Sequence, residues 1–461
     1  MTANPPRILF AAPGSESGKT LAACAVLSAL RGKGVESAAF KCGPDYIDPM
    51  FHRKVLEKSA ANLDLFLMGA DACRRLLAEG SSGASFSLIE GVMGYYDGLG
   101  RTDRYSSYYL AREMSTPVVL IVDCSGMAVT LAAILNGMVS YRSDSAIKGV
   151  IFNRIKPGMY AFYRSVVEEN TPLKVLGFLP EMPDCRFDSR HLGLITADEI
   201  GDIQSKMEKL GAQAVKSIDL DALMQIARSA GSFSYMPLTF DRQFDVKIAV
   251  AQDRVFCFYY RNGLAVLEKL GARLIFFSPL AGEPLPACDG LLLGGGYPEL
   301  YLEQLSKNSD VLAGIRKAVL SGMPCVAECG GFLFLQKGMR NAHDKLLPMV
   351  GALEGEAFMT DGLKRFGYVK LTAKCDNLLC AAGESLSAHE FHYSDSTFCG
   401  DSFTAEKPGG TRQYACIAAG PTLFAGYPHI HFAGQPKAAV RFVAACAAFQ
   451  AGNSPRHMPD F

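Results

Sequence analysis

A loop with the residue types of a phosphate-binding site follows the first apolar run of the sequence. The segment 12-APGSESGKT-20 separates the strand-like RILFAAP from the helix-like LAACAVLSALRGKG. In such a loop, backbone N–H groups and a helix N-terminus bind phosphates, a Lys reaches the β- and γ-phosphates, and a Thr hydroxyl holds Mg²⁺. An ordinary strand–turn–helix connection is the alternative, but Gly-Lys-Thr in this position favours ATP binding. The residues expected to contact the nucleotide are Gly14, Ser15, Glu16, Ser17, Gly18, Lys19 and Thr20.

Acidic residues stand at or just beyond predicted strand ends in the same half of the chain. The four candidates are Asp45, Asp48, Glu90 and Asp97. Open parallel sheets bind ligands at this edge, where carboxylates coordinate Mg²⁺ directly or through water. We expect Asp45 and Glu90 to hold the metal together with Thr20, and Asp48 and Asp97 to lie nearer the reacting groups as catalytic residues. For each acid, a helix cap or turn is the alternative.

A second candidate site surrounds Cys329. PCVAE is typical of a strand, Cys329 falls at the turn, and GGFLFLQKG continues as a helix. This order exposes a nucleophile beside backbone N–H groups, and a thiolate near a helix N-terminus and a His attacks acyl groups. Gly330, with Gly295 and Gly296 across the pocket, is expected to contact the substrate through an oxyanion hole. A plain loop is the alternative for the three consecutive glycines.

Two His residues are candidates for the base that serves Cys329. His429 and His431 alternate along a predicted strand, so their side chains are expected on one face. No acidic residue follows His429 at a spacing of two. Glu390 or His431 is therefore expected to orient the base, unless the Cys–His pair works alone. Three other His residues lack such a constellation and are expected to be surface or cap residues: His52, His343 and His457.

These sites require elements that place them at sheet edges. In the first half, apolar strand-length runs that end at Gly, Pro, Asp or Asn alternate with helical stretches, which predicts a parallel sheet covered by helices. The stretch 196–231 has helical apolar spacing. A loop-like segment follows at 232–245, and a second strand–helix alternation then begins with VKIAVAQD. We therefore predict an α/β protein of two domains, 1–235 and 246–461.

Composition excludes several classes of function. Lys+Arg 46 and Asp+Glu 46 give a formal net charge of 0, which argues against nucleic-acid binding. The apolar runs are too short to span a membrane, and the N-terminus lacks the pattern of a signal peptide. The 14 Cys include no C-x-x-C pair, so most are expected to be reduced, buried and inert. A cytoplasmic enzyme is expected.

Ten short motifs, in one order along nearly the whole chain, carry a resemblance to a known family. They are GPDYIDP, NLD, EGVMGYYDG, RHLGL, FCFYY, FSPL, GGGYPEL, AECGGFLFL, HEFHYS and HIHF. With them, the first half resembles the dethiobiotin-synthetase-like branch of P-loop proteins, and the whole chain is similar to the cobyrinic acid a,c-diamide synthase family. The phosphate loop differs from the family's commoner motif at Pro13 and Glu16.

The resemblance implies a P-loop synthetase domain followed by a class I glutamine amidotransferase-like domain. The implied reaction is amidation of the a and c side-chain carboxylates of a corrinoid, with ATP, Mg²⁺ and glutamine, through an acyl phosphate. It also implies that His429 is the base and that Asn153 contacts adenine, although an Asn at a strand end is often a turn residue. Tyr46, Arg190 and His191 are the implied substrate-binding residues; Arg190 and His191 as a structural pair are the alternative.

Other readings remain open. The same chemistry on hydrogenobyrinate or nickel-sirohydrochlorin would use overlapping motifs. A P-loop nucleotide switch is the alternative of a different class. The motifs AECGG and HIHF argue against it, because a switch does not require a glutaminase site. The expected partners are small molecules: a corrinoid tetrapyrrole, ATP and L-glutamine, with no nucleic acid and no membrane. A homodimer is left open.

Overall fold

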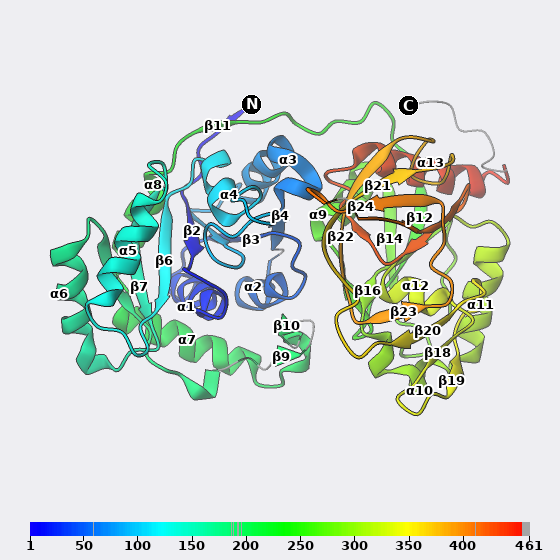
Figure 1. Cartoon of the computed structure of the whole chain (residues 1–461). Coiled ribbons are helices and arrows are strands. Elements are labelled where there is room, and N and C mark those ends of the chain that lie inside the picture. Colours follow the sequence, from blue (N-terminus) through cyan, green and yellow to red (C-terminus); the bar gives the residue numbers. More distant parts are fainter. Residues whose placement is uncertain are drawn as a thin grey trace. The chain divides into compact units, whose positions relative to one another are not determined.

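The computed structural model describes residues 1–58, 60–185, 187, 189–190, 193–194, 196–410 and 412–453. The chain divides into two compact units, Met1–Leu238 and Thr239–Phe461 (Figure 1). Each unit has its own apolar core, and each is an α/β structure, which confirms the predicted fold class. Within the described ranges, no helix is both long enough and apolar enough to cross a membrane.

The first unit is built on a seven-stranded parallel sheet with the order β4-β3-β5-β2-β6-β7-β8. Its strands are apolar on both faces, because helices cover both. All carboxyl ends therefore meet at one edge, where ligands bind in such sheets. In chain order the strands are β2 (Arg7–Ala11), β3 (Ser37–Cys42), β4 (Ala61–Leu63), β5 (Phe86–Glu90), β6 (Val118–Asp123), β7 (Ile147–Asn153) and β8 (Lys174–Phe178).

Eight helices are described in this unit. Asp64 begins α3 by accepting hydrogen bonds from the N–H groups of Phe66 and Leu67 at 2.9 Å. The helices are α1 (Lys19–Gly32), α2 (Asp48–Leu56), α3 (Leu65–Gly80), α4 (Ser107–Glu113), α5 (Thr130–Ser140), α6 (Tyr160–Asn170), α7 (Ile203–Ser217) and α8 (Leu220–Arg228). Three short 3₁₀ turns complete them, at Pro157–Met159, Pro183–Cys185 and Ala197–Glu199.

The stretch 196–231 is not one continuous helix. Ile218 is extended, with φ −119° and ψ 133°, and Asp219 starts α8 by accepting the N–H of Ala222. Two small antiparallel pairs also belong to this unit: β1 (Thr2–Ala3) with β11 (Phe233–Ser234), and β9 (Ser189–Arg190) with β10 (Gly193–Leu194). The pairing of β1 with β11 places the end of this unit beside its N-terminal segment.

The second unit contains a six-stranded sheet with the order β14-β12-β15-β17-β27-β26, parallel except for β26. Its strands are β12 (Val246–Ala251), β14 (Ala272–Phe277), β15 (Gly290–Leu293), β17 (Cys325–Glu328), β26 (Ala418–Gly420) and β27 (Leu423–Gly426). Its helices are α9 (Arg261–Lys269), α10 (Leu302–Leu305), α11 (Ser309–Leu320), α12 (Gly330–Leu335) and α13 (Pro436–Gln450), with a 3₁₀ turn at Pro298–Leu300.

Three smaller sheets are also described in the second unit. A five-stranded antiparallel sheet consists of β21 (Arg365–Ala373), β22 (Ser385–His392), β24 (Phe403–Glu406), β25 (Gln413–Cys416) and β28 (His429–Ile430). A two-stranded sheet pairs β13 (Phe256–Phe258) with β16 (Gly295–Gly296). The last sheet contains β18 (Gly338–Arg340), β19 (Leu346–Pro348), β20 (Glu356–Met359) and β23 (Ser394–Ser396).

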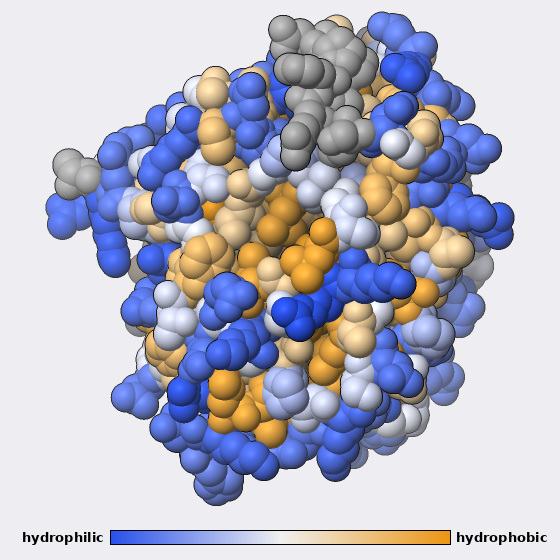
Figure 2. Space-filling view, turned by 90° about the vertical axis from the view of Figure 1, so that its right-hand side faces the viewer, coloured by the Kyte–Doolittle hydropathy of each residue, from blue (hydrophilic) through white to orange (hydrophobic). Residues whose placement is uncertain are grey.

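The face in Figure 2 is mainly hydrophilic, with apolar residues gathered near its middle. Large apolar side chains that are exposed include Val129, Tyr141 and Leu320, each more than 60% accessible. Single exposed apolar groups of this kind are normal on proteins and mark no site by themselves.

Candidate active sites

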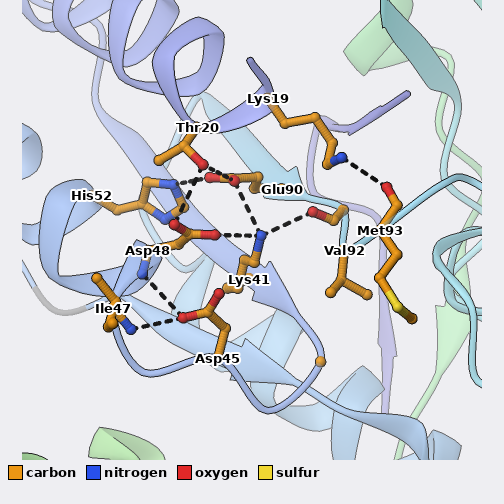
Figure 3. Close-up of polar contacts among 12 residues, drawn as sticks. Lys19, Thr20, Lys41, Asp45, Ile47, Asp48, His52, Glu90, Val92 and Met93 are labelled. Atoms are coloured by element: carbon orange, nitrogen blue, oxygen red, sulfur yellow. Dashed lines mark hydrogen bonds and ion pairs between the residues drawn. The ribbon is translucent and has the colours of Figure 1, made fainter. Parts of the chain in front are cut away.

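The loop between β2 and α1 has the backbone of a phosphate-binding turn. Glu16 and Gly18 adopt left-handed conformations, with φ 59° and 89°. A Cβ atom on Gly18 would lie 2.1 Å from Asn153 Nδ2, so both the backbone and the space require glycine there. Lys19 Nζ donates to the carbonyl of Met93 at 2.7 Å (Figure 3). It also donates to the carbonyl of Gly14 at 3.1 Å. Burial, together with the charge of Lys41, lowers the pKa of Lys19 to about 8.

A buried polar cluster lies beside this loop (Figure 3). Thr20 Oγ1 is 2.6 Å from Glu90 Oε1 and 3.3 Å from Asp48 Oδ1. Lys41 Nζ is 2.6 Å from Asp48 Oδ2 and 3.1 Å from Glu90 Oε1. On the other side, His52 Nε2 is 2.6 Å from Glu90 Oε2. The carboxyl end of β5 thus carries a carboxylate that three side chains hold in place.

The charges in this cluster are balanced internally. Burial alone would raise the pKa of Glu90, but Lys41 and the hydrogen bonds from His52 and Thr20 bring that pKa below its usual value. The pKa of Asp48 is raised, first by burial and then by the neighbouring charges of Asp45 and Glu90. The surrounding donors therefore favour the anionic form of Glu90.

The oxygen atoms of Thr20, Asp48 and Glu90 fit a Mg²⁺ site, because hydroxyl and carboxylate oxygens are the ligands this ion prefers. Asp45, also expected at the metal, caps a turn in this structure. Its Oδ1 accepts the N–H groups of Ile47 at 2.8 Å and Asp48 at 3.3 Å. Asp48, expected nearer the reacting groups, is the aspartate that reaches Thr20, and the roles of both aspartates remain predictions.

Two other predicted residues in this unit also support turns. Asp97 is exposed, and its Oδ2 accepts the N–H of Gly94 at 2.9 Å. Asn153 is buried, and its Nδ2 donates to the carbonyl of Ser17 at 2.9 Å. In this structure the Asn153 amide therefore fastens the phosphate loop, and its contact with adenine stays a prediction.

The predicted substrate-binding residues of the first unit are only partly described. Tyr46 is half-buried, next to Asp45. Arg190 lies in the short strand β9, and only its backbone is described. His191 lies outside the described residues. The roles of these three residues remain predictions.

Two members of the buried cluster, Lys41 and His52, are not assigned to a site by the sequence analysis. Lys41 is the next-to-last residue of β3, and its side chain is 3% exposed. Its Nζ also donates to the carbonyl of Gly91 at 2.9 Å. His52 was expected at the surface, and that expectation is wrong, because the side chain is fully buried against Glu90. A signal existed: His52 follows Asp48 by four residues on α2, which places both on one helix face.

In the second unit, Cys329 sits on the sharp turn that the sequence predicts. It has φ 45° and ψ −102° between β17 and α12. A Cβ atom on Gly331 would lie 2.2 Å from the carbonyl of Leu293, and one on Gly330 would lie 3.0 Å from the Gly296 nitrogen. Only glycines allow this close approach, which brings Cys329 beside the backbone of β16.

His429 lies at the same point. Its side chain is hydrogen-bonded to Cys329 and to Glu328, with 3.2 Å between Nδ1 and Glu328 Oε2. A Cβ atom on Gly295 would lie 2.5 Å from His429 Cε1, so the base packs directly on β16. Burial would lower the pKa of His429, but Cys329 and Glu328 raise it to about 10. The arrangement favours the protonated form of His429 beside Cys329.

The two groups expected to orient His429 lie elsewhere. In the register of β22 and β28, His389 is opposite His429, so the next residue, Glu390, points to the other face. There Glu390 accepts a hydrogen bond from the Tyr414 hydroxyl and lies 3.7 Å from Lys407 Nζ. The expectation for Glu390 is therefore wrong.

His431 also has other contacts. Its ring stacks on Tyr260 with 4.5 Å between centroids, and its Nδ1 accepts the N–H of Ala433 at 3.2 Å. The strand β28 ends before it, at Ile430. His343 is exposed, as expected, and His457 lies outside the described residues. The group that contacts His429 is Glu328, which directly precedes Cys329 in the sequence and which sequence reasoning missed.

Comparison with known proteins assigns both sites to families. Residues 8–195 match the CobQ/CobB/MinD/ParA nucleotide binding domain, which includes the loop and the acidic cluster. Residues 247–437 match the CobB/CobQ-like glutamine amidotransferase domain, which includes Cys329 and His429. Each match thus lies within one unit of the structure.

Relatives of known name match nearly the whole chain. A cobyrinate a,c-diamide synthase from Caldanaerobacter subterraneus subsp. tengcongensis is 37% identical over 445 residues, 96% of this chain and 98% of the relative. The enzyme of that name from Thermoplasma volcanium is 37% identical over 448 residues, 96% of this chain and 97% of the relative. One from Clostridium tetani is 36% identical over 432 residues, 93% and 97% of the two chains. The chain therefore belongs to the cobyrinate a,c-diamide synthase family.

Proposed function

We propose that this protein amidates the a and c side-chain carboxylates of cobyrinate, with ATP and glutamine, in cobalamin biosynthesis. The observation that carries the proposal is the presence of two complementary sites in one chain. One has a phosphate loop beside the Glu90 cluster, and the other has Cys329 hydrogen-bonded to His429. A carboxylate must be activated before ammonia can attack it, and glutamine must be hydrolysed to supply the ammonia. The two sites divide these tasks.

In the first unit, the carboxylate of the substrate attacks the γ-phosphorus of ATP and ADP leaves, which gives an acyl phosphate. Ammonia then attacks the acyl carbon, the C–O bond to the phosphoryl group breaks, and inorganic phosphate leaves while the nitrogen loses a proton to give the amide. Lys19 and the loop N–H groups would hold the phosphates. Thr20, Asp48 and Glu90 would hold Mg²⁺, which when bound offsets phosphate charge. His52 and Lys41 fix the Glu90 carboxylate for that role.

In the second unit, the Cys329 thiolate attacks the side-chain amide carbon of glutamine. His429 gives its proton to the departing nitrogen, so that ammonia leaves and a thioester remains. The same imidazole then takes a proton from water, which hydrolyses the thioester to glutamate. Backbone N–H groups of β16 and of Gly330 would stabilise the negative charge on the carbonyl oxygen.

Further assignments belong to this proposal. The segments 1–235 and 246–461 act as the synthetase and glutaminase domains, Asn153 contacts adenine, and Tyr46, Arg190 and His191 contact the tetrapyrrole. Asp97 positions the intermediate or the ammonia. The Cys side chains are all free, which suits a reducing compartment, and we place the enzyme in the cytoplasm. Assembly into a homodimer is left to measurement.

The direct test is an assay of the purified protein with ATP, Mg²⁺ and glutamine on three substrates: cobyrinate, hydrogenobyrinate and nickel-sirohydrochlorin. We expect the a,c-diamide of cobyrinate by mass spectrometry, with glutamate released in step. Conversion of only one of the other two tetrapyrroles would move the substrate assignment to that compound. A nucleotide switch would hydrolyse ATP without releasing glutamate, and that result would reject the amidotransferase function.

A further inference from the structure

Glu328 holds two successive residues of β28 with its two carboxylate oxygens. Oε2 lies 3.2 Å from His429 Nδ1, and Oε1 accepts the N–H of Ile430 at 3.0 Å. The carboxylate is buried, with 11% of the side chain exposed, and the His429 side chain is 4% exposed. Since a ring has two nitrogens and Nδ1 faces Glu328, the Nε2 atom is the one left for Cys329.

From this geometry we infer that Glu328 is the positioning residue of the glutaminase site: it fixes the tautomer and orientation of His429 toward Cys329. The inference rests on the proposed function of the second unit. Because Glu328 and Cys329 are consecutive at the end of β17, one strand end places both the nucleophile and the carboxylate that orients its base.

The surroundings of His429 favour this role over a merely structural one. The groups that face it are Cys329, Glu328 and, from the adjacent strand, His389; His392 is also near enough to interact. Burial, with the charge of His429 next, lowers the pKa of His389 to about 3, and burial lowers the pKa of His392 to about 4. Both rings are therefore neutral at pH 7, which leaves the Glu328 carboxylate to stabilise the His429 imidazolium.

The consequence for Cys329 can be measured as a pH profile. If Glu328 supports the imidazolium, the thiolate–imidazolium pair persists over neutral pH, and alkylation of Cys329 changes little between about pH 7 and 9. An unassisted thiol, with a pKa near 8.5, reacts about tenfold more slowly for each unit of pH below that value. Peptide mapping by mass spectrometry identifies Cys329 among the other cysteines.

The test compares Glu328→Gln, Glu328→Asp and the control Glu356→Gln, whose carboxylate pairs with Arg340 on β18. In Glu328→Gln we expect kcat for glutamine hydrolysis to fall by about 10²–10⁴-fold, as when the acid of a related triad is neutralised, with KM changed less than about threefold. Alkylation of Cys329 should acquire the profile of an ordinary thiol. Glu328→Asp should recover part of kcat, and Glu356→Gln should match the wild type.

Two outcomes overturn the inference. One is a Glu328→Gln variant with wild-type kcat and an unchanged alkylation profile. The other is loss of activity with lowered thermal stability but an unchanged profile, which would make Glu328 only structural. Failure of the proposed function is distinguishable, because it would show as glutamine hydrolysis that survives replacement of Cys329 itself.

Discussion

His52 Nε2 lies 2.6 Å from Glu90 Oε2, and neither side chain is exposed to solvent. The opposite oxygen, Oε1, is shared by Thr20 and Lys41. The two oxygens of Glu90 are therefore held by three elements, with His52 on α2, Lys41 on β3 and Thr20 on α1. These contacts fix the orientation of the carboxylate at the edge of the sheet.

Replacement of His52 by Ala should therefore weaken the nucleotide site without touching the phosphates directly. We expect the affinity for Mg–ATP to fall by about 10–100-fold, as for other groups that orient a metal ligand. Calorimetric titration of the variant with Mg–ATP measures this. His52→Gln, which keeps an N–H donor near the same position, should recover part of the affinity. Equal affinity in wild type and His52→Ala would contradict the role of His52.

Lys19→Ala and Glu90→Gln should remove amidation with either nitrogen source, because glutamine and free ammonium both need the same activated carboxylate. Glutamine hydrolysis at Cys329 should continue in both variants when measured without amidation. Product formation is followed by mass spectrometry at saturating ammonium. Normal ammonium-dependent amidation in either variant would falsify the assignment of the first site.

Asp97 supports the turn at Gly94 and is exposed near the phosphate loop. Asp97→Asn should slow product formation more than it weakens nucleotide binding, because the loss falls on the positioning of the intermediate or the ammonia. Steady-state rates and ATP calorimetry on the same preparation separate the two effects. If ATP affinity is the main loss, Asp97 belongs to the nucleotide site instead.

Tyr259 links the end of β12 to the residue that precedes β16 in the second site. Its hydroxyl accepts the N–H of Gly294 at 2.8 Å and donates to the carbonyl of Ala251. Tyr259→Phe leaves both backbone groups without this partner, which costs about 1–3 kcal/mol and loosens β16. We expect glutamine hydrolysis to fall by about tenfold or more while ammonium-dependent amidation is kept. A variant with unchanged hydrolysis would exclude a role for this hydroxyl in holding β16.

Local sequence patterns predict the turn at Cys329 and the phosphate loop, because the residues that each feature needs are nearly consecutive in the sequence. Gly18 and the glycines after Cys329 are needed for backbone geometry, and that need is visible in the sequence. The α/β class follows from strand-length apolar runs. The strand β4 is too short for this rule, because ANL has only three residues.

The remaining errors concern contacts that only tertiary packing creates. Asp45 and Asp48 stand three residues apart, and the turn between them decides which one reaches Thr20. Glu328 contacts His429 across about a hundred residues of sequence, so no spacing rule would find it. Glu390 fails for a related reason, since the register of β22 with β28 sends its side chain to the opposite face.

The central claim is that one chain makes ammonia at Cys329 and uses it at the phosphate-loop site. The most direct test is the amidation rate of Cys329→Ala with glutamine and, separately, with a high concentration of ammonium salt. We expect no glutamine-dependent product and an ammonium-dependent rate close to that of the wild type, with Cys325→Ala as a matched control that keeps both. Glutamine-dependent amidation that survives in Cys329→Ala would contradict the claim.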